Sequence, residues 1–136
     1  MIAPAEVEVE AKIEQFRQEP ALWDSDPVEK YFSGLPSAAN GLRLSGRVDT
    51  QTSDALILTL RVEGTDGKTL EGNVTFLLHP TLPNPVQVVT TRNNAAQTTI
   101  YTEGWFHAAA VAEAGRTVLV LDLRTIPGVP EWYTKA

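Results

Sequence analysis

The stretch from Val74 to Val89 constrains the fold more than any other part of the sequence. It places three prolines, Pro80, Pro83 and Pro85, between two runs of β-favouring residues. In the first run, residues 74–78, apolar side chains recur at the two-residue period of a pleated strand. Proline donates no ladder hydrogen bond and holds the preceding residue in extended geometry, so the first strand must end at the prolines. We therefore predict a stiff loop between two strands.

This loop has two interpretations. A stiff loop loses little conformational entropy on binding, which suits a recognition loop that presents His79, Thr81 and Leu82. Alternatively, the prolines form a crossover between the two sheets of a sandwich and bind nothing. Periodicity alone leaves both interpretations open.

The pattern of short strands continues through most of the chain. Alternating apolar runs are separated by turn signals such as Asp66-Gly67 and Asn93-Asn94. The predicted strands cover residues 42–48, 56–62, 70–78, 86–91, 98–102, 105–111 and 117–123. Short strands at regular spacing are typical of an antiparallel two-sheet sandwich, and we predict an all-β fold of this kind.

The N-terminal region has a different period. Residues 3–19 are predicted to form a helix that ends at Pro20, with one apolar stripe made by Ala5, Val9, Ile13 and Phe16. So narrow a stripe does not stabilise an isolated helix. The helix must dock on the domain itself or on another chain, and a homo-oligomer through this helix is one such arrangement.

A second, short helix is predicted to follow, over residues 27–33, with Asp26 as its N-cap and Pro27 in its first position. Residues 35–41 are rich in Pro, Ser, Ala, Asn and Gly, which is the composition of a linker. We therefore divide the chain into a helical N-terminal extension with its linker (1–41), a sandwich (42–126) and an extended C-terminal tail (127–136).

Composition excludes several classes of function. The net charge is −6 and no cluster of Lys and Arg occurs, which argues against nucleic-acid binding. The absence of cysteine excludes disulfides, thiolate zinc sites and cysteine nucleophiles. No apolar run is long enough to span a membrane, and the N-terminus is acidic where a signal peptide is basic, so we expect a cytoplasmic protein.

Catalytic and metal sites find little support. His79, His107 and Asp122 lack the clustered spacing of metal ligands. A nucleophile at Thr81 or Ser45 would lack the strained Gly-x-Ser-x-Gly turn. We therefore expect no enzyme activity, no catalytic residue, no metal and no cofactor.

The remaining constellation is aromatic. Gly104 precedes Trp105 and Phe106 at the start of a predicted strand, and a glycine there permits close approach and leaves an amide hydrogen available. Together with the Thr81 hydroxyl, these groups suit a flat, amide-bearing ligand. The alternative is that Trp105 is the core tryptophan of the sandwich.

The two segments resemble the signature of the YEATS domain family. The string from Val74 to Val86 is similar to that family's strand and His-x-Ser/Thr-Phe-Pro-x-Pro loop, and Gly104-Trp105 is similar to its Gly-aromatic step. The His-Pro-Thr order and the ending Leu119–Leu123 look like the prokaryotic branch. The resemblance extends over about residues 42–123.

The resemblance implies an immunoglobulin-like β-sandwich that reads acylated lysine between two aromatic walls. Leu82 falls where the second aromatic residue is expected, so these two loops supply one wall only. What it implies is a non-catalytic module for an acyl-lysine-like or other small amide-bearing ligand, such as an acylated peptide or protein, in a bacterial defence or signalling system. The implied ligand-binding residues are His79, Thr81, Leu82, Gly104, Trp105 and Phe106. The alternative is a structural adaptor that docks to a partner protein and has a vestigial pocket.

Overall fold

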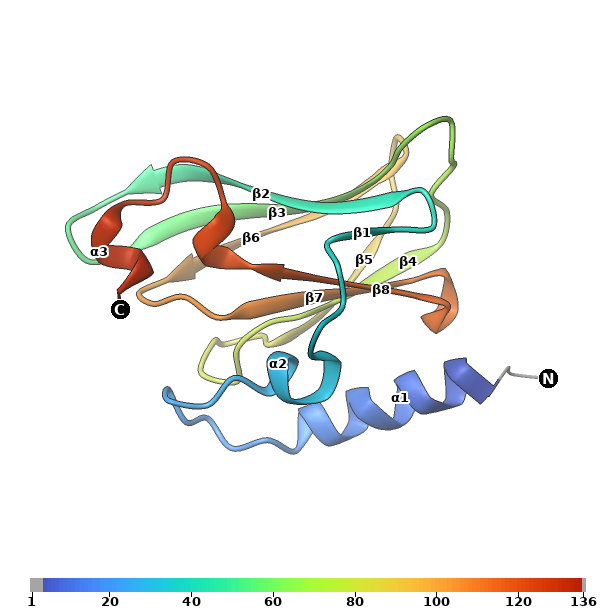
Figure 1. Ribbon diagram of the computed structural model, residues 1–136, viewed down its shortest axis with the longest axis horizontal. Helices are drawn as coiled ribbons and strands as arrows, with labels where there is room; N and C mark the ends of the chain where they lie inside the picture. Colours follow the sequence, from blue (N-terminus) through green and yellow to red (C-terminus); the bar gives the residue numbers. More distant parts are fainter. Residues whose placement is uncertain (1–3, 136) are drawn as a thin grey trace.

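The computed structural model describes residues 4–135, with side chains from residue 6 onward. It consists of three layers: two antiparallel β-sheets that face each other, and a pair of helices beneath the second sheet (Figure 1). The first sheet has the strand order β1-β2-β3-β6 and the second has the order β5-β4-β7-β8. The predicted all-β sandwich is confirmed.

The strands of the first sheet are β1 (Ala38–Ala39), β2 (Leu42–Gln51), β3 (Leu56–Gly64) and β6 (Ala95–Thr102). Those of the second sheet are β4 (Asn73–Leu77), β5 (Val86–Thr90), β7 (His107–Ala112) and β8 (Thr117–Asp122). The helices are α1 (Pro4–Arg17), α2 (Pro27–Phe32) and α3 (Glu131–Thr134), and two 3-10 turns cover Glu113–Gly115 and Leu123–Thr125.

The main core lies between the two sheets. On β3, Leu56, Leu58 and Leu60 are buried while Ile57 on the opposite face is partly exposed, as the alternation predicts. Their partners across the core include Phe76 of β4. Each of these side chains is nearly or fully removed from water, which stabilises the fold by about 1.5–3 kcal/mol per side chain.

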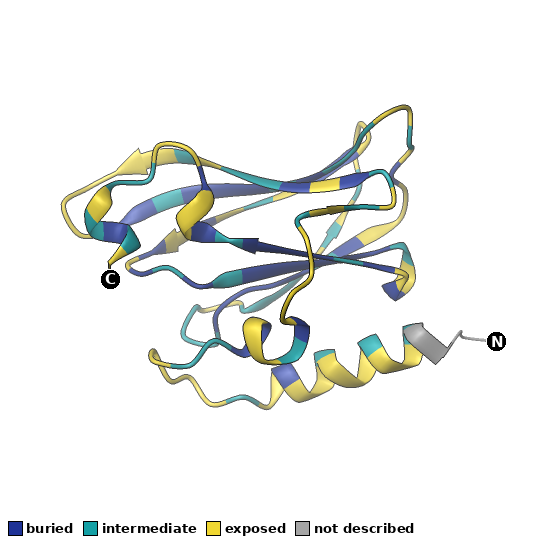
Figure 2. Ribbon diagram, viewed as in Figure 1, coloured by how far each residue is buried: buried dark blue, intermediate teal, exposed yellow. Residues whose placement is uncertain are grey.

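In the second sheet, the strand β7 is buried on both faces, whereas the edge strand β5 remains partly exposed (Figure 2). The outer face of this sheet packs against α1 and α2 in a second apolar cluster around Phe16, Val28 and Phe32. This explains why β7 reads as a continuous apolar run without alternation. Val9 and Ile13 of α1 pack partly buried against this cluster, so the helix docks on its own domain. Ala5 lies outside the described side chains.

The helix α2 begins as the sequence predicts. The Asp26 carboxylate accepts a hydrogen bond from the Glu29 amide, and Pro27 occupies the first turn. The segment before α2, residues 18–26, runs along one end of the sandwich; we call it the strap.

Two segments differ from the prediction. Residues 38–39 of the predicted linker pair with β2 and extend the first sheet. The tail, expected to be extended, contains the one-turn helix α3. Its Tyr133 is buried, and the Tyr133 hydroxyl donates a hydrogen bond to the Gly104 carbonyl at 3.0 Å, so the turn hides a ring without leaving its hydroxyl unsatisfied. None of the helices in the described part of the chain is long and apolar enough to cross a membrane.

Candidate functional site

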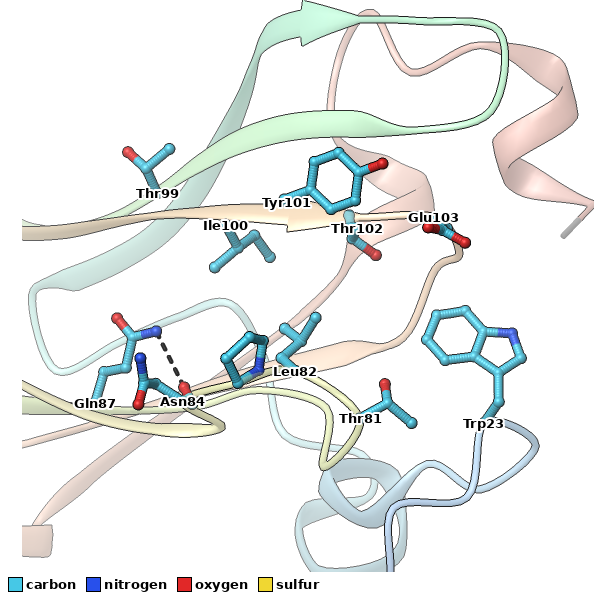
Figure 3. A pocket seen from close by; sticks show the side chains of 11 residues that line it. Trp23, Thr81, Leu82, Asn84, Gln87, Thr99, Ile100, Tyr101, Thr102 and Glu103 are labelled. Atoms are coloured by element: carbon cyan, nitrogen blue, oxygen red, sulfur yellow. Dashed lines mark hydrogen bonds between the residues drawn. The ribbon is translucent and has the colours of Figure 1, made fainter.

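A cavity of about 690 Å³ lies between the edge strand β6 and the proline loop that joins β4 to β5 (Figure 3). Three separate segments form it. The lining residues are Trp23 from the strap, Thr81, Leu82, Pro83, Asn84 and Gln87 from the loop and the start of β5, and Thr99, Ile100, Tyr101, Thr102 and Glu103 from β6. The proline loop therefore lines a hollow as well as joining two strands.

Different groups stand at the two ends of the cavity. At one end the Thr98 hydroxyl donates a hydrogen bond to the Gln87 side chain at 2.5 Å, which ties β6 to β5 across the sandwich. At the other end stands the indole of Trp23 (Figure 3). The cavity is thus a groove with a polar contact at one end and an aromatic ring at the other.

The position of Trp23 depends on Gly104. A Cβ atom at residue 104 would lie 2.1 Å from Trp23 Cζ2, so a residue with a side chain there would collide with the indole. The same indole packs on His79, with ring centroids 4.9 Å apart, and His79 packs in turn on Phe106 at 5.5 Å. Trp23 is nevertheless about half exposed, which leaves part of its surface toward the groove.

The hydrogen bonds of His79 indicate which of its ring nitrogens donates and which accepts. His79 is buried, and its Nε2 lies 2.7 Å from the Ser25 carbonyl oxygen, which only accepts hydrogen bonds. Nε2 therefore carries a proton, and the Thr81 amide, which can only donate, meets a lone pair on Nδ1. Nδ1 is then the acceptor, for the Thr81 amide at 3.3 Å and the Thr81 hydroxyl at 2.7 Å.

This assignment decides what Thr81 offers a ligand. Its hydroxyl proton is committed to His79, so toward the groove the hydroxyl oxygen acts as an acceptor. The pair also has the spacing of a nucleophile and a base, but the group that orients the base is the neutral carbonyl of Ser25. A neutral carbonyl does not stabilise an imidazolium as a carboxylate does.

The backbone of Gly104 is satisfied within the protein. Its amide donates to the Thr102 hydroxyl oxygen at 3.3 Å, and its carbonyl accepts from Thr102 at 2.5 Å and from Tyr133 at 3.0 Å. The hydrogen of this amide therefore does not point outward to a ligand. Gly104 contributes to the site by admitting the Trp23 ring.

Trp105 lies outside the cavity lining. It stacks against the Arg124 guanidinium, 3.7 Å from the ring centroid, and meets His107 edge-on at 6.0 Å. Phe106 is fully buried in the main core, and Trp105 packs partly buried against the same core. Of the six predicted residues, the structure thus brings Thr81 and Leu82 into the groove and His79 directly behind them. Ligand contact by all six residues stays a prediction.

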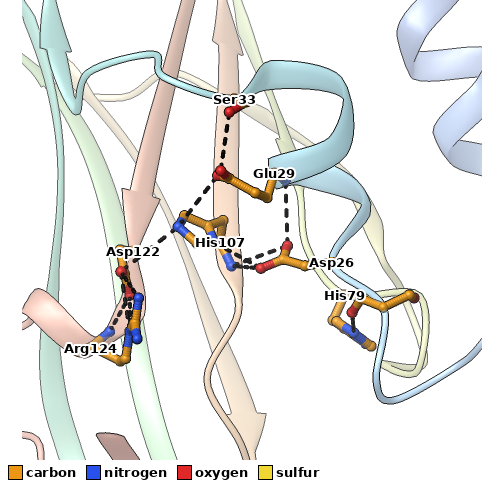
Figure 4. A network of polar contacts seen from close by, with 8 residues as sticks. Asp26, Glu29, Ser33, His79, His107, Asp122 and Arg124 are labelled. Atoms are coloured by element: carbon orange, nitrogen blue, oxygen red, sulfur yellow. Dashed lines mark hydrogen bonds and ion pairs between the residues drawn. The ribbon is translucent and has the colours of Figure 1, made fainter.

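A polar network anchors the strap to β7 (Figure 4). Asp26 meets the side chain of His107 at 2.7 Å and its backbone amide at 3.1 Å. Asp122 lies 3.8 Å from His107 and pairs with Arg124 at 2.7 Å. Burial opposes ionisation of Asp122, but hydrogen bonds from Arg124 outweigh it and hold the Asp122 pKa below its usual range.

This network separates the residues of the metal hypothesis. His107 and Asp122 belong to it, whereas His79 is engaged with Ser25 and Thr81. Over residues 4–135, no group of three or more His, Asp or Glu side chains is arranged to hold a metal ion.

Sequence reasoning missed Trp23 and Tyr101 as lining residues. Trp23 sits in a non-helical stretch between two predicted helices, and an aromatic residue there was a signal of docking. Tyr101 faces solvent on an edge strand, with 57% of its surface exposed, and nothing in the alternation distinguishes it from any other outward residue.

Comparison with known proteins adds one match. Residues 57–124, half of the chain, match the family model of the prokaryotic YEATS domain. No curated protein matches the sequence. The matched span contains the proline loop, β6 and Gly104, whereas Trp23 and the rest of the strap lie outside it.

Proposed function

Because the chain belongs to the prokaryotic YEATS domain family, a family of non-catalytic reader modules, we propose that its groove binds an amide-bearing side chain of the acyl-lysine type. The observation that carries this proposal is the Thr81 hydroxyl, whose oxygen is an acceptor on the groove wall because the hydroxyl donates its hydrogen bond to His79. An acceptor at that point suits the N–H of a secondary amide.

The apolar part of such a ligand has suitable neighbours. The methylenes of an acylated lysine would lie along Leu82, and the flat amide would lie against the face of Trp23. The sequence has Leu82 at the position where the family resemblance implies a second aromatic wall. In this proposal Trp23, supplied by the strap, is an aromatic wall of the site.

Titration with a minimal ligand tests the proposal. The probe is ε-N-acetyl-lysine with blocked termini, compared with the same compound lacking the ε-acetyl group, by NMR or calorimetry. Thr81→Val removes the acceptor and should weaken binding about fivefold, the effect of roughly 1 kcal/mol for one net hydrogen bond. Thr81→Ser keeps the hydroxyl and is the matched control. Equal binding of both compounds, or no difference between the two variants, would contradict the proposal.

The adaptor alternative predicts a different arrangement of Trp105 and Leu82. An adaptor with a vestigial pocket was expected to pack Trp105 beneath Leu82 and leave no hollow. Instead the groove is present beside Leu82, and Trp105 stacks on Arg124. The presence of the groove favours the reader, whereas the placement of Trp105 matches neither expectation, because the reader was also expected to line its pocket with Trp105. A role as an accessory domain of a bacterial defence or signalling system remains part of this proposal.

A further inference from the structure

The strand β6 is the edge of its sheet. It pairs with β3 along its whole length, and no other described strand pairs with its outer side. Exposed edges are normally protected by charges, proline or bulges. The segment Gln97–Thr102 has no charged residue and no proline, and its threonines, isoleucine and tyrosine favour β-structure.

The groove runs along this unpaired edge. Ile100 and Thr102 are buried on the inner face of β6, whereas Tyr101 is exposed on the outer face, and all three line the groove (Figure 3). A hollow touched by side chains from both faces of one strand must lie at the edge of that strand. It therefore follows the row of β6 backbone groups that β3 leaves unpaired.

We propose that an extended peptide adds to β6 as a fifth strand of the first sheet and inserts one side chain between Leu82 and Trp23. The backbone of the peptide would pair with β6, and alternate side chains would point into the groove and toward solvent. This inference rests on the proposed function only in that the inserted side chain is the amide-bearing one.

The charge of the groove limits which peptides can bind there. Among the residues that the structure describes, Glu103 is the one charged residue that lines it, and the chain carries a net charge of −6. The peptide is therefore neutral to basic. A second copy of this chain fits less well, because the inward side chains of its own β6, Ile100 and Thr102, are already buried in its core.

The test uses a nine-residue peptide, Arg-Thr-Val-Thr-Lys-Thr-Val-Thr-Arg, with ε-N-acetyl-lysine at its centre and blocked ends. One derivative carries a backbone N-methyl group on every residue at an even position. The other carries one on every residue at an odd position except the two terminal residues. Only one of these sets faces β6 in an added strand. That derivative should bind at least about tenfold more weakly than the other, the effect of one to two lost hydrogen bonds. Amide exchange by NMR should show new protection at alternate residues of β6.

The outcomes separate this inference from the proposed function. If both N-methyl sets bind equally and blocked acetyl-lysine still binds, strand addition is overturned and the side-chain site stands. If the peptide without its acetyl group binds with the same one-sided sensitivity, strand addition stands and the amide site fails. If neither probe binds, both fail. Protection of β6 that rises with protein concentration without peptide, together with a dimer in sedimentation, would also overturn the inference, because the occupant would be a second copy.

Discussion

Gly104→Ala should displace Trp23 without changing Trp23 itself. The new Cβ would lie 2.1 Å from Trp23 Cζ2, and ordinary contacts begin at 3.4 Å, so the indole has to move by at least about 1.3 Å. The indole is half exposed and has room to swing outward, and Gly104 has no positive φ that an alanine would strain. The sandwich should therefore remain folded while the aromatic end of the groove opens.

The expected loss follows from what the wall contributes. One aromatic stacking contact contributes about 0.5–1.5 kcal/mol, so binding of blocked acetyl-lysine should weaken roughly two- to tenfold. Trp23→Ala should cause a loss of similar size. Because both changes remove the same contact, they should not add: Gly104→Ala should have little further effect in the Trp23→Ala background.

Calorimetric titration of the four proteins of this double-mutant cycle, with a melting curve for each, measures both quantities. Full additivity would mean that Gly104 acts independently of Trp23. Unchanged binding by the single variant Gly104→Ala would mean that the indole is not a wall of the ligand site. Either result would refute the reasoning.

Three further predictions follow from other parts of the structure. Leu82→Phe should add an aromatic face to the groove and tighten acetyl-lysine binding up to about tenfold, measured by the same titration. Phe16→Ala should lower the free energy of unfolding by about 3–5 kcal/mol in urea denaturation, because Phe16 is buried where α1 meets the second sheet. Burial raises the pKa of Tyr133 to about 12, so the folded protein keeps a proton that the unfolded chain loses above about pH 10. Stability should therefore fall by roughly 2–3 kcal/mol between pH 10 and 12, and Tyr133→Phe should lack this part of the decrease.

The sandwich was predictable because its first sheet is buried on one face. One-sided burial imposes a two-residue alternation, as on β3, and alternation can be read directly from a sequence. The helical N-terminus was predictable for a similar reason, since its stripe of Val9, Ile13 and Phe16 has helical spacing. In both cases the signal is local.

The orientation of Trp105 was not predictable in this way. The strand predicted over residues 105–111 begins only at His107, so Trp105 and Phe106 lie in the irregular segment before β7, where strand alternation does not fix the direction of a side chain. The order Gly-Trp-Phe does not say which aromatic residue turns inward. Only the packing of Phe106 against the core and of Arg124 on Trp105 decides it.

The candidate site is composite, and its missing part comes from the strap. Within four residues, Trp23 covers Gly104, the Ser25 carbonyl accepts a hydrogen bond from His79, and Asp26 both caps α2 and binds His107. The first contact supplies an aromatic wall and the second decides which protons Thr81 offers. Both contacts join residues far apart in the sequence, and the strap lies outside the span that matches the family model. The chemistry of the groove is therefore set by residues beyond that span as much as by the loop within it.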